Sequence, residues 1–140
     1  MTTYTEQRKL KMTDKDFRRI YDKADVAGMV AVNSCTPTPM VVQEHANMLD
    51  DNSPVAKQWI VAGGVCGFAW INIKPGNNRF CNWLKAVGLA KHSEYEGGVT
   101  IWVTHGGQSM QIKEAYAHAF ARVIREEIPE LRVYALSRMD

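Results

Sequence analysis

The chain has 140 residues, which is the length of a single domain. Hydrophobic residues make up 46% of it and charged residues 23%, an ordinary globular composition. The formal net charge of +2 permits an anionic partner. It falls short of the clustered basicity that is typical of a dedicated DNA-binding domain.

The three cysteines, Cys35, Cys66 and Cys81, are an odd number, and no apolar signal-peptide stretch precedes them. Free thiols in a reducing cytosol are therefore expected rather than disulfides. The longest apolar runs are far too short to span a bilayer. We expect a soluble intracellular protein without a membrane partner.

The N-terminal region is predicted to be a polar arm followed by a helix. Residues 1–12 are expected to be flexible or to be ordered only by a partner, and residues 13–140 to form one α+β domain. Thr13 precedes acidic residues that suit a helix start, and the apolar positions that follow keep helical spacing. Over residues 26–32 a continued helix and a strand are both compatible with the sequence. We expect the helix to cover the free face of the sheet.

The middle of the chain is predicted to be irregular. Pro37 and Pro39 each remove a backbone donor and favour an extended predecessor, so residues 34–39 are expected to form an extended connector into residues 40–42. Residues 43–54 are polar and rich in turn-forming residues. They are expected to be a surface loop in which an insertion would be tolerated.

The remainder of the chain is predicted to read β-α-β-α-β. Residues 65–74 are apolar on both faces, which indicates a central strand covered on each side. Helices that connect strands favour neighbouring strands that are largely parallel or split, with the helices packed on the sheet. The expected fold class is α+β, a compact single-layer sheet of three or four strands with packed helices and an N-terminal helix. The other predicted elements are a helix over residues 80–87, a strand over residues 99–104, a helix over residues 109–128 and a last strand over residues 131–136.

The long helix near the C-terminus is predicted from a single apolar stripe, whose members recur at i, i+3, i+4 and i+7. Lys113 lies on the opposite, charged side of this helix. Ser109 is suited to cap its start, and Pro129 disfavours helix at Ile128 and so ends it. The stripe consists of Ile112, Ala115, Tyr116, Ala119, Phe120, Val123 and Ile124.

The start of this helix is the candidate ligand site. A glycine pair permits the positive φ angles of a tight turn, and a helix start presents free N–H groups and a positive dipole end to an anion. Arg138 joins the site if the last strand lies beside the strand that ends at Thr104 and is parallel to it, whereas an antiparallel placement would not bring it there. An ordinary capped helix start with solvated charges is the alternative. The predicted ligand-binding residues are Gly106, Gly107, Gln108, Ser109, Lys113 and Arg138, with Tyr95 or Trp102 at the edge of the site.

Other chemistry has little support in the sequence. The cysteines and histidines form no CxxC, HxH or HExxH pair, so neither a metal site nor a cofactor is predicted. Trp70, Trp83 and Trp102 are expected to pack in the core because they fall on strands and on an apolar helix face, while Trp59 is expected to be more exposed. A stacking platform for single-stranded nucleic acid is the alternative for these aromatic residues.

Three segments and the C-terminal ending together carry a resemblance to other proteins. They are TPTPMVV at residues 36–42, GVCGFAWINIKPGNNRFCNWLK at 64–85, YEGGVTIWVTHGGQSMQIKEAYAHAFARVIRE at 95–126, and the ending SRMD. In these segments the chain resembles a group of small uncharacterised proteins encoded by tailed bacteriophages and prophages. The likeness covers roughly residues 36–140, without residues 43–62. It implies a phage gene product that acts in the cytoplasm of an infected bacterium, and it implies no catalytic residue.

These observations lead us to expect a non-enzymatic phage accessory protein that binds a phosphate-bearing small molecule, a nucleic acid or a host protein, in a role such as counter-defence. A minor virion component is one alternative, since residues 1–12 have the polarity of an arm that becomes ordered on a neighbouring subunit. A homo-oligomer also stays open. The last alternative is a small hydrolase or nucleotide-modifying enzyme with His105 or His92 as general base and Glu114 nearby.

Overall fold

Helix α2, which spans Asp14–Ser34, begins where the sequence predicts. The computed structural model describes residues 12–47, 49 and 52–140, so the predicted arm over residues 1–12 lies outside the described residues except for its last member. The Thr13 side chain accepts a hydrogen bond from the Asp16 amide, and the Asp16 carboxylate accepts one from the Thr13 amide. This reciprocal capping box fixes the start of the helix. Of the two alternatives for residues 26–32, the structure contains the helix.

Helix α2 is followed by two sheets and two further helices. Strands β1 and β2 form a hairpin, and strands β3 to β6 form a second sheet with α3 and α4 in its connections. The bounds are Met40–His45 for β1, Val55–Val61 for β2, Gly67–Lys74 for β3, Arg79–Ala86 for α3, Lys91–His92 for β4, Val99–Trp102 for β5, Met110–Glu127 for α4 and Arg132–Met139 for β6.

The larger sheet has the strand order β4-β5-β3-β6, and every neighbouring pair is antiparallel. Strand β5 separates β3 from β4, the two strands that α3 connects, and β3 separates β5 from β6, the two that α4 connects. This is the split β-α-β arrangement of ferredoxin-like domains. The predicted α+β class is confirmed, with the split arrangement rather than parallel neighbours. The two-residue strand β4 lies between the predicted helix over residues 80–87 and the predicted strand that begins at residue 99, where no element was predicted, so the connectivity is β-α-β-β-α-β.

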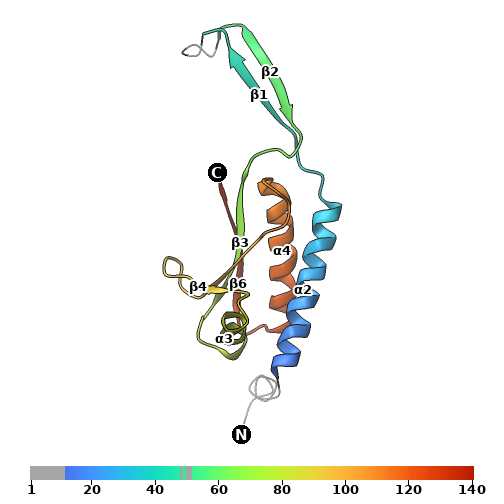
Figure 1. Ribbon diagram of the computed structural model, residues 1–140, viewed down its shortest axis with the longest axis vertical. Coiled ribbons are helices and arrows are strands. Elements are labelled where there is room, and N and C mark those ends of the chain that lie inside the picture. Colours follow the sequence, from blue (N-terminus) through green and yellow to red (C-terminus); the bar gives the residue numbers. More distant parts are fainter. Residues whose placement is uncertain (1–11, 48, 50–51) are drawn as a thin grey trace.

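Both long helices lie on the same side of this sheet (Figure 1). Helix α4 packs on β3 and β6, and α2 packs on α4. The prediction that the N-terminal helix covers the free face of the sheet is wrong, because its buried residues are used in the core on the side of α4. The opposite face of the sheet therefore carries no described helix. The buried residues of α2 are Phe17, Ile20, Ala24 and Gly28.

The hairpin of β1 and β2 projects away from the rest of the molecule (Figure 1). Its strands pair from Met40 opposite Val61 to Glu44 opposite Lys57. The first residues of the predicted loop over residues 43–54 continue β1, and β2 is a strand that the sequence did not predict. Both faces of the ribbon are exposed, which is unusual because a two-stranded sheet alone is marginally stable.

Polar contacts join the two long helices in addition to apolar packing. The Tyr116 hydroxyl of α4 donates a hydrogen bond to the Asp25 carboxylate of α2, and Lys23 Nζ lies 2.8 Å from Glu127 Oε1. Gly28 leaves room for the Tyr116 ring, since a Cβ at this position would come within 2.5 Å of it. Burial of the phenol, together with its hydrogen bond to Asp25, raises the pKa of Tyr116 above its ordinary value of 10.0.

This raised pKa predicts a loss of stability in alkali. Below pH 10 the phenol is protonated in both states, whereas above pH 10 the unfolded chain ionises first and the folded state becomes less stable. Tyr116→Phe is expected to lower the free energy of unfolding by about 1–2 kcal/mol at neutral pH, through the lost hydrogen bond, and to make its fall above about pH 10 shallower. Urea unfolding at several pH values measures both effects. An unchanged alkaline slope in the variant would contradict the assignment.

Candidate functional site

The uncovered face of the larger sheet carries a set of aromatic and basic side chains. Residues of β3 alternate between the two faces, so Ala69, Ile71 and Ile73 point into the core and the residues between them point outward. Their partners on β5 and β6 share the same outward face because paired residues lie on one side of a sheet. The outward residues of the three strands are Phe68, Trp70, Asn72, Lys74, Thr100, Trp102, Arg132, Tyr134, Leu136 and Arg138, of which Asn72 and Thr100 are buried.

Phe68 lies close to two cations at one end of this face. Lys113 Nζ is 5.2 Å from the centre of its ring, and the Arg138 guanidinium carbon is 5.8 Å from it. Arg138 is the residue directly opposite Phe68 in the pairing of β3 with β6. Both distances are in the range of a cation–π interaction. The two cations therefore approach a half-exposed aromatic ring from two different elements.

Lys113 is held in place from beneath the sheet. It is only 8% exposed, and its Nζ donates a hydrogen bond of 3.2 Å to the carbonyl oxygen of Gly67. The expectation that Lys113 lies on the solvated side of α4 is wrong, because its long stem runs along the helix to the end of β3. Its ammonium group consequently has a fixed position at the end of the open face.

A pair of tryptophans occupies the centre of the open face. Trp70 of β3 and Trp102 of β5 lie directly opposite each other, with ring centres 5.1 Å apart and an interplanar angle of 46°. Trp102 is 51% exposed, so the expectation that it packs in the core is wrong, whereas Trp83 is buried as expected. The Trp70 indole N–H donates to the Glu96 carboxylate, which orients the ring. The pair presents an aromatic surface to solvent.

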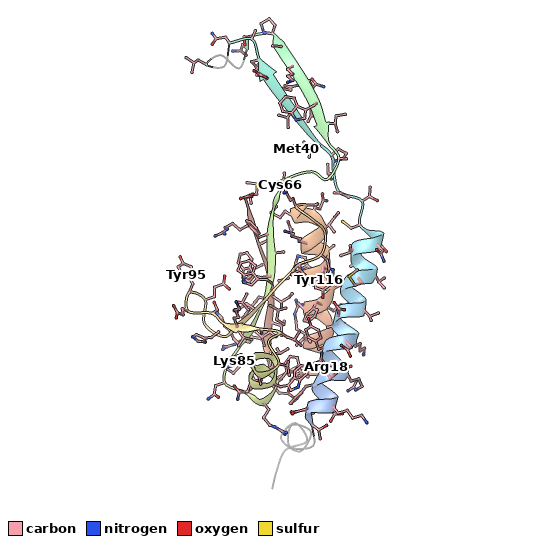
Figure 2. All side chains as sticks on the ribbon, in the orientation of Figure 1. Arg18, Met40, Cys66, Lys85, Tyr95 and Tyr116 are labelled. Carbon is pink, nitrogen blue, oxygen red and sulfur yellow. The ribbon has the colours of Figure 1, made fainter. Side chains whose placement is uncertain are left out.

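A loop between β4 and β5 borders the tryptophan pair. Glu96 in this loop accepts the Trp70 hydrogen bond, and the Gly97 carbonyl accepts one of 2.9 Å from the Asn72 amide. Tyr95 is 99% exposed at the tip of the loop, which projects to the side of the sheet away from α4 (Figure 2). Tyr95 thus lies at the rim of the open face.

Polar groups of the glycine turn before α4 form hydrogen bonds with other parts of the chain. Ser109 accepts a hydrogen bond from the Ile112 amide and donates one of 2.8 Å to the Gly63 carbonyl, so its hydroxyl is already paired. The Met110 amide donates to the Val65 carbonyl. The predicted cap is confirmed, and these contacts favour a positioning role for the turn over direct anion binding. Gly106 and Gly107 have φ angles of 97° and 60°, and the Gln108 carbonyl accepts a hydrogen bond from the Gly67 amide.

Strand direction explains why Lys113 and Arg138 meet. Strands β5 and β6 both run antiparallel to β3, so they are parallel to each other and end at the same end of the sheet. The start of α4 lies at that end too. Cys66, just before β3, forms a β-bridge with Ser109 at the start of α4, and the Cys66 carbonyl accepts a hydrogen bond from the Asp140 amide just after β6. Of the predicted residues, the structure places Trp102 and Arg138 on the open face, and it brings the buried Lys113 ammonium from beneath the sheet to the end of that face. Gly106, Gly107, Gln108 and Ser109 form the turn before α4 and are not on this face.

The sequence analysis missed Phe68 and Trp70 as members of a site. The run over residues 65–74 contains a hydrophobic residue at nearly every position, and it was interpreted as a strand covered on both sides. A signal was present, since the outward positions are Phe68, Trp70, Asn72 and Lys74, whereas the inward ones are small or aliphatic. Aromatic and polar residues on one face and aliphatic residues on the other indicate a strand with one open face.

The residues that could bind a metal ion or act as an acid or base are dispersed in the structure. Among the residues that the structure describes, no group of three His, Cys, Asp or Glu side chains lies close enough to hold a metal ion. The His105 ring lies 4.9 Å from the Tyr116 ring, and its Nε2 lies 3.8 Å from Asp25 Oδ1. Its described partners are thus residues that join α2 to α4. Glu114 lines a separate hollow at the base of the hairpin with Thr38 and Met40.

Comparisons with protein-family models, with curated proteins and with solved structures found no match to this chain. In the described part of the chain, no helix is long and apolar enough to cross a membrane.

The held position of Lys113 predicts a stability difference between two cations of α4. Lys113→Ala is expected to lower the free energy of unfolding by about 1–3 kcal/mol, because the buried Gly67 carbonyl loses its donor and the packed stem is removed. Arg122→Ala, at an exposed position of the same helix, is the matched control and is expected to change it by less than about 0.5 kcal/mol. Urea unfolding measures both. Equal, small effects would show that Lys113 is not held by the sheet.

Proposed function

We propose that this chain is a non-enzymatic protein that binds single-stranded nucleic acid on the open face of its four-stranded sheet. The observation that carries the proposal is the group of Phe68, Trp70 and Trp102 on adjacent central strands, of which Phe68 and Trp102 are exposed, with Lys113 and Arg138 near the Phe68 ring. RNA-binding modules built on a four-stranded sheet stack two or three bases on aromatic residues of that sheet. Here this is an analogy of chemistry and layout, since a fold alone does not imply a function.

The aromatic part of the face suits unpaired bases. Every base has a flat ring surface, so stacking on Trp102 or Phe68 needs no particular sequence, and each stacked base contributes about 1–3 kcal/mol. A duplex keeps its bases stacked on one another and does not offer these surfaces to a sheet. The open face therefore favours a single strand over a duplex.

The basic part of the face suits the phosphates that connect such bases. Arg138 and Lys113 flank Phe68, while Lys74 lies 5.9 Å from the ring of Tyr134 and directly opposite Arg132. On this face β3 presents Phe68, Trp70, Asn72 and Lys74 in order, and the paired positions of β6 are Arg138, Leu136, Tyr134 and Arg132, so the cations lie at the two ends and aromatic rings lie between them. A single strand laid along β3 and β6 would stack its bases on the rings and bring its phosphates near the cations at the ends.

The resemblance to phage proteins supports a setting for this activity. A binder of single-stranded nucleic acid encoded by a phage would act in the cytoplasm of the infected bacterium as an accessory protein. A role in counter-defence fits such a binder, because replication and many defence reactions pass through single-stranded intermediates.

Removal of the exposed tryptophan is expected to weaken nucleic-acid binding. Trp102→Ala should raise the dissociation constant for fluorescein-labelled oligothymidine or oligouridine by about tenfold or more, since one stacked base is worth about 1–3 kcal/mol. Trp102→Phe keeps a ring and should retain most of the affinity. Fluorescence anisotropy at low salt measures these constants. The absence of binding by the unaltered chain, or equal binding by Trp102→Ala, would rule the proposal out.

A second prediction concerns the phosphate contacts. Arg138→Ala should reduce the slope of log affinity against log salt concentration by about 0.7, the value for one neutralised phosphate on a single strand. Lys15→Ala, an exposed cation at the start of α2, is the control and should leave the slope unchanged. If both variants change the slope equally, binding reflects the overall charge of the chain rather than this face.

A further inference from the structure

The hairpin that projects from the body has an uncovered strand edge on β2. In the described chain β2 pairs with β1 on one side only. The pairing is regular from Lys57 to Val61, and the register shifts between Glu44 and His45, where β2 has one extra residue. The regular part of β2 is therefore a five-residue edge, residues 57–61, with Trp59 at its centre.

This edge lacks the features that normally prevent strands from joining. Proteins protect an edge strand with charged residues, proline or a bulge. The regular part of β2 carries one charge, Lys57, and no proline, and its bulge lies before it. Three apolar residues follow Gln58, and two of them are well exposed, Trp59 at 44% and Ile60 at 66%. Such an edge is a template for another strand.

We propose that a second copy of this chain pairs with this edge, β2 against β2 and antiparallel, about a two-fold axis at Trp59. The product is a four-stranded sheet in the order β1-β2-β2-β1, which places two hairpins side by side with the two bodies at opposite ends. This inference rests on the hairpin alone and is independent of the proposed nucleic-acid binding.

In this arrangement the edge pairs with itself about Trp59. Trp59 faces Trp59 of the partner subunit, Lys57 faces Val61 of the partner subunit, and Gln58 faces Ile60 of the partner subunit. No like charges meet, and an aromatic pair on the axis is among the favourable cross-strand pairs. The two-fold axis makes the contacts of the two chains identical, so Trp59 and Ile60 are covered in both chains.

The charges of the hairpin favour a second copy over an anionic partner. Lys57 lies directly opposite Glu44 within the hairpin, so the paired strands carry no net charge from these two residues. The outer edge of β1, in contrast, ends in Glu44 and His45 and is less suited to self-pairing. The stability of the ribbon also favours pairing, because two strands alone are marginal and a sheet of three or more is not.

The test uses two variants with opposite charges on the axis. Trp59→Lys and Trp59→Glu each place two like charges opposite each other in a homodimer, so each should raise the dissociation constant of the dimer by roughly fivefold or more. An equimolar mixture of the two should recover association, because a heterodimer then pairs Lys with Glu. Sedimentation velocity over a range of protein concentrations gives the constants for each sample.

Val42→Lys is the matched control. Val42 lies opposite Trp59 on β1, so this variant places a charge on the same face of the same hairpin but away from the axis. It should leave dimerisation nearly unchanged. The proposal is overturned if the unaltered chain sediments as one chain at every concentration, or if Val42→Lys and Trp59→Lys weaken association equally. Association that Trp102→Lys abolishes and Trp59→Lys does not would place the contact on the open sheet face and would also overturn it.

Discussion

The antiparallel pairing of β3 with β6 is the constraint on which the arrangement of the open face depends. Its register places Phe68 opposite Arg138 and Trp70 opposite Leu136. Because side chains alternate along a strand, a shift by one residue would turn Phe68 and Trp70 into the core and bring Ala69 and Ile71 into water. The register is therefore fixed by the aliphatic face that α4 covers, and the aromatic face follows from it.

Helix α4 contributes to both sides of the sheet. Its buried residues include Phe120 and Ile124, which pack in the core, and its first turn also carries Lys113 to the carbonyl of Gly67. The glycine turn and Ser109 hold the start of the helix against the segment before β3 through hydrogen bonds to Gly63 and Val65. The cation beside Phe68 is thus positioned by the same contacts that begin the helix. In physical terms the turn supports one end of the open face.

Local signals in the sequence were sufficient for most elements. Thr13 and Ser109 cap their helices through bonds that span three residues, and Pro129 follows the end of α4, so each boundary depends on neighbouring residues alone. The face that α2 covers could not be predicted, because a stripe of apolar residues shows that a helix packs but not against which surface. The position of Lys113 depends on an interaction with Gly67, 46 residues earlier in the chain, and helical periodicity carries no information about it. Strand β2 was not predicted because six of its seven residues are exposed, so its sequence does not alternate between apolar and polar residues.

The open sheet face and the β2 edge, the two surfaces for which we propose a role, differ in charge and in chemistry. Together they suggest how a weakly charged chain could bind a polyanion. With a net charge of only +2, one open face has few cations with which to hold a polyanion, and Glu96 lies beside Trp70 at its rim. As a proposed platform for a single strand, one such face would bind through stacking more than through charge, and its affinity would be limited by the few bases that it covers. Two chains joined by their hairpins would present two such platforms to one strand. The second contact is then intramolecular, with a high effective concentration that needs no additional cation on either face. A weakly charged hairpin and a small aromatic face are the combination expected of a protein that gains affinity from the association of two chains rather than from basic charge.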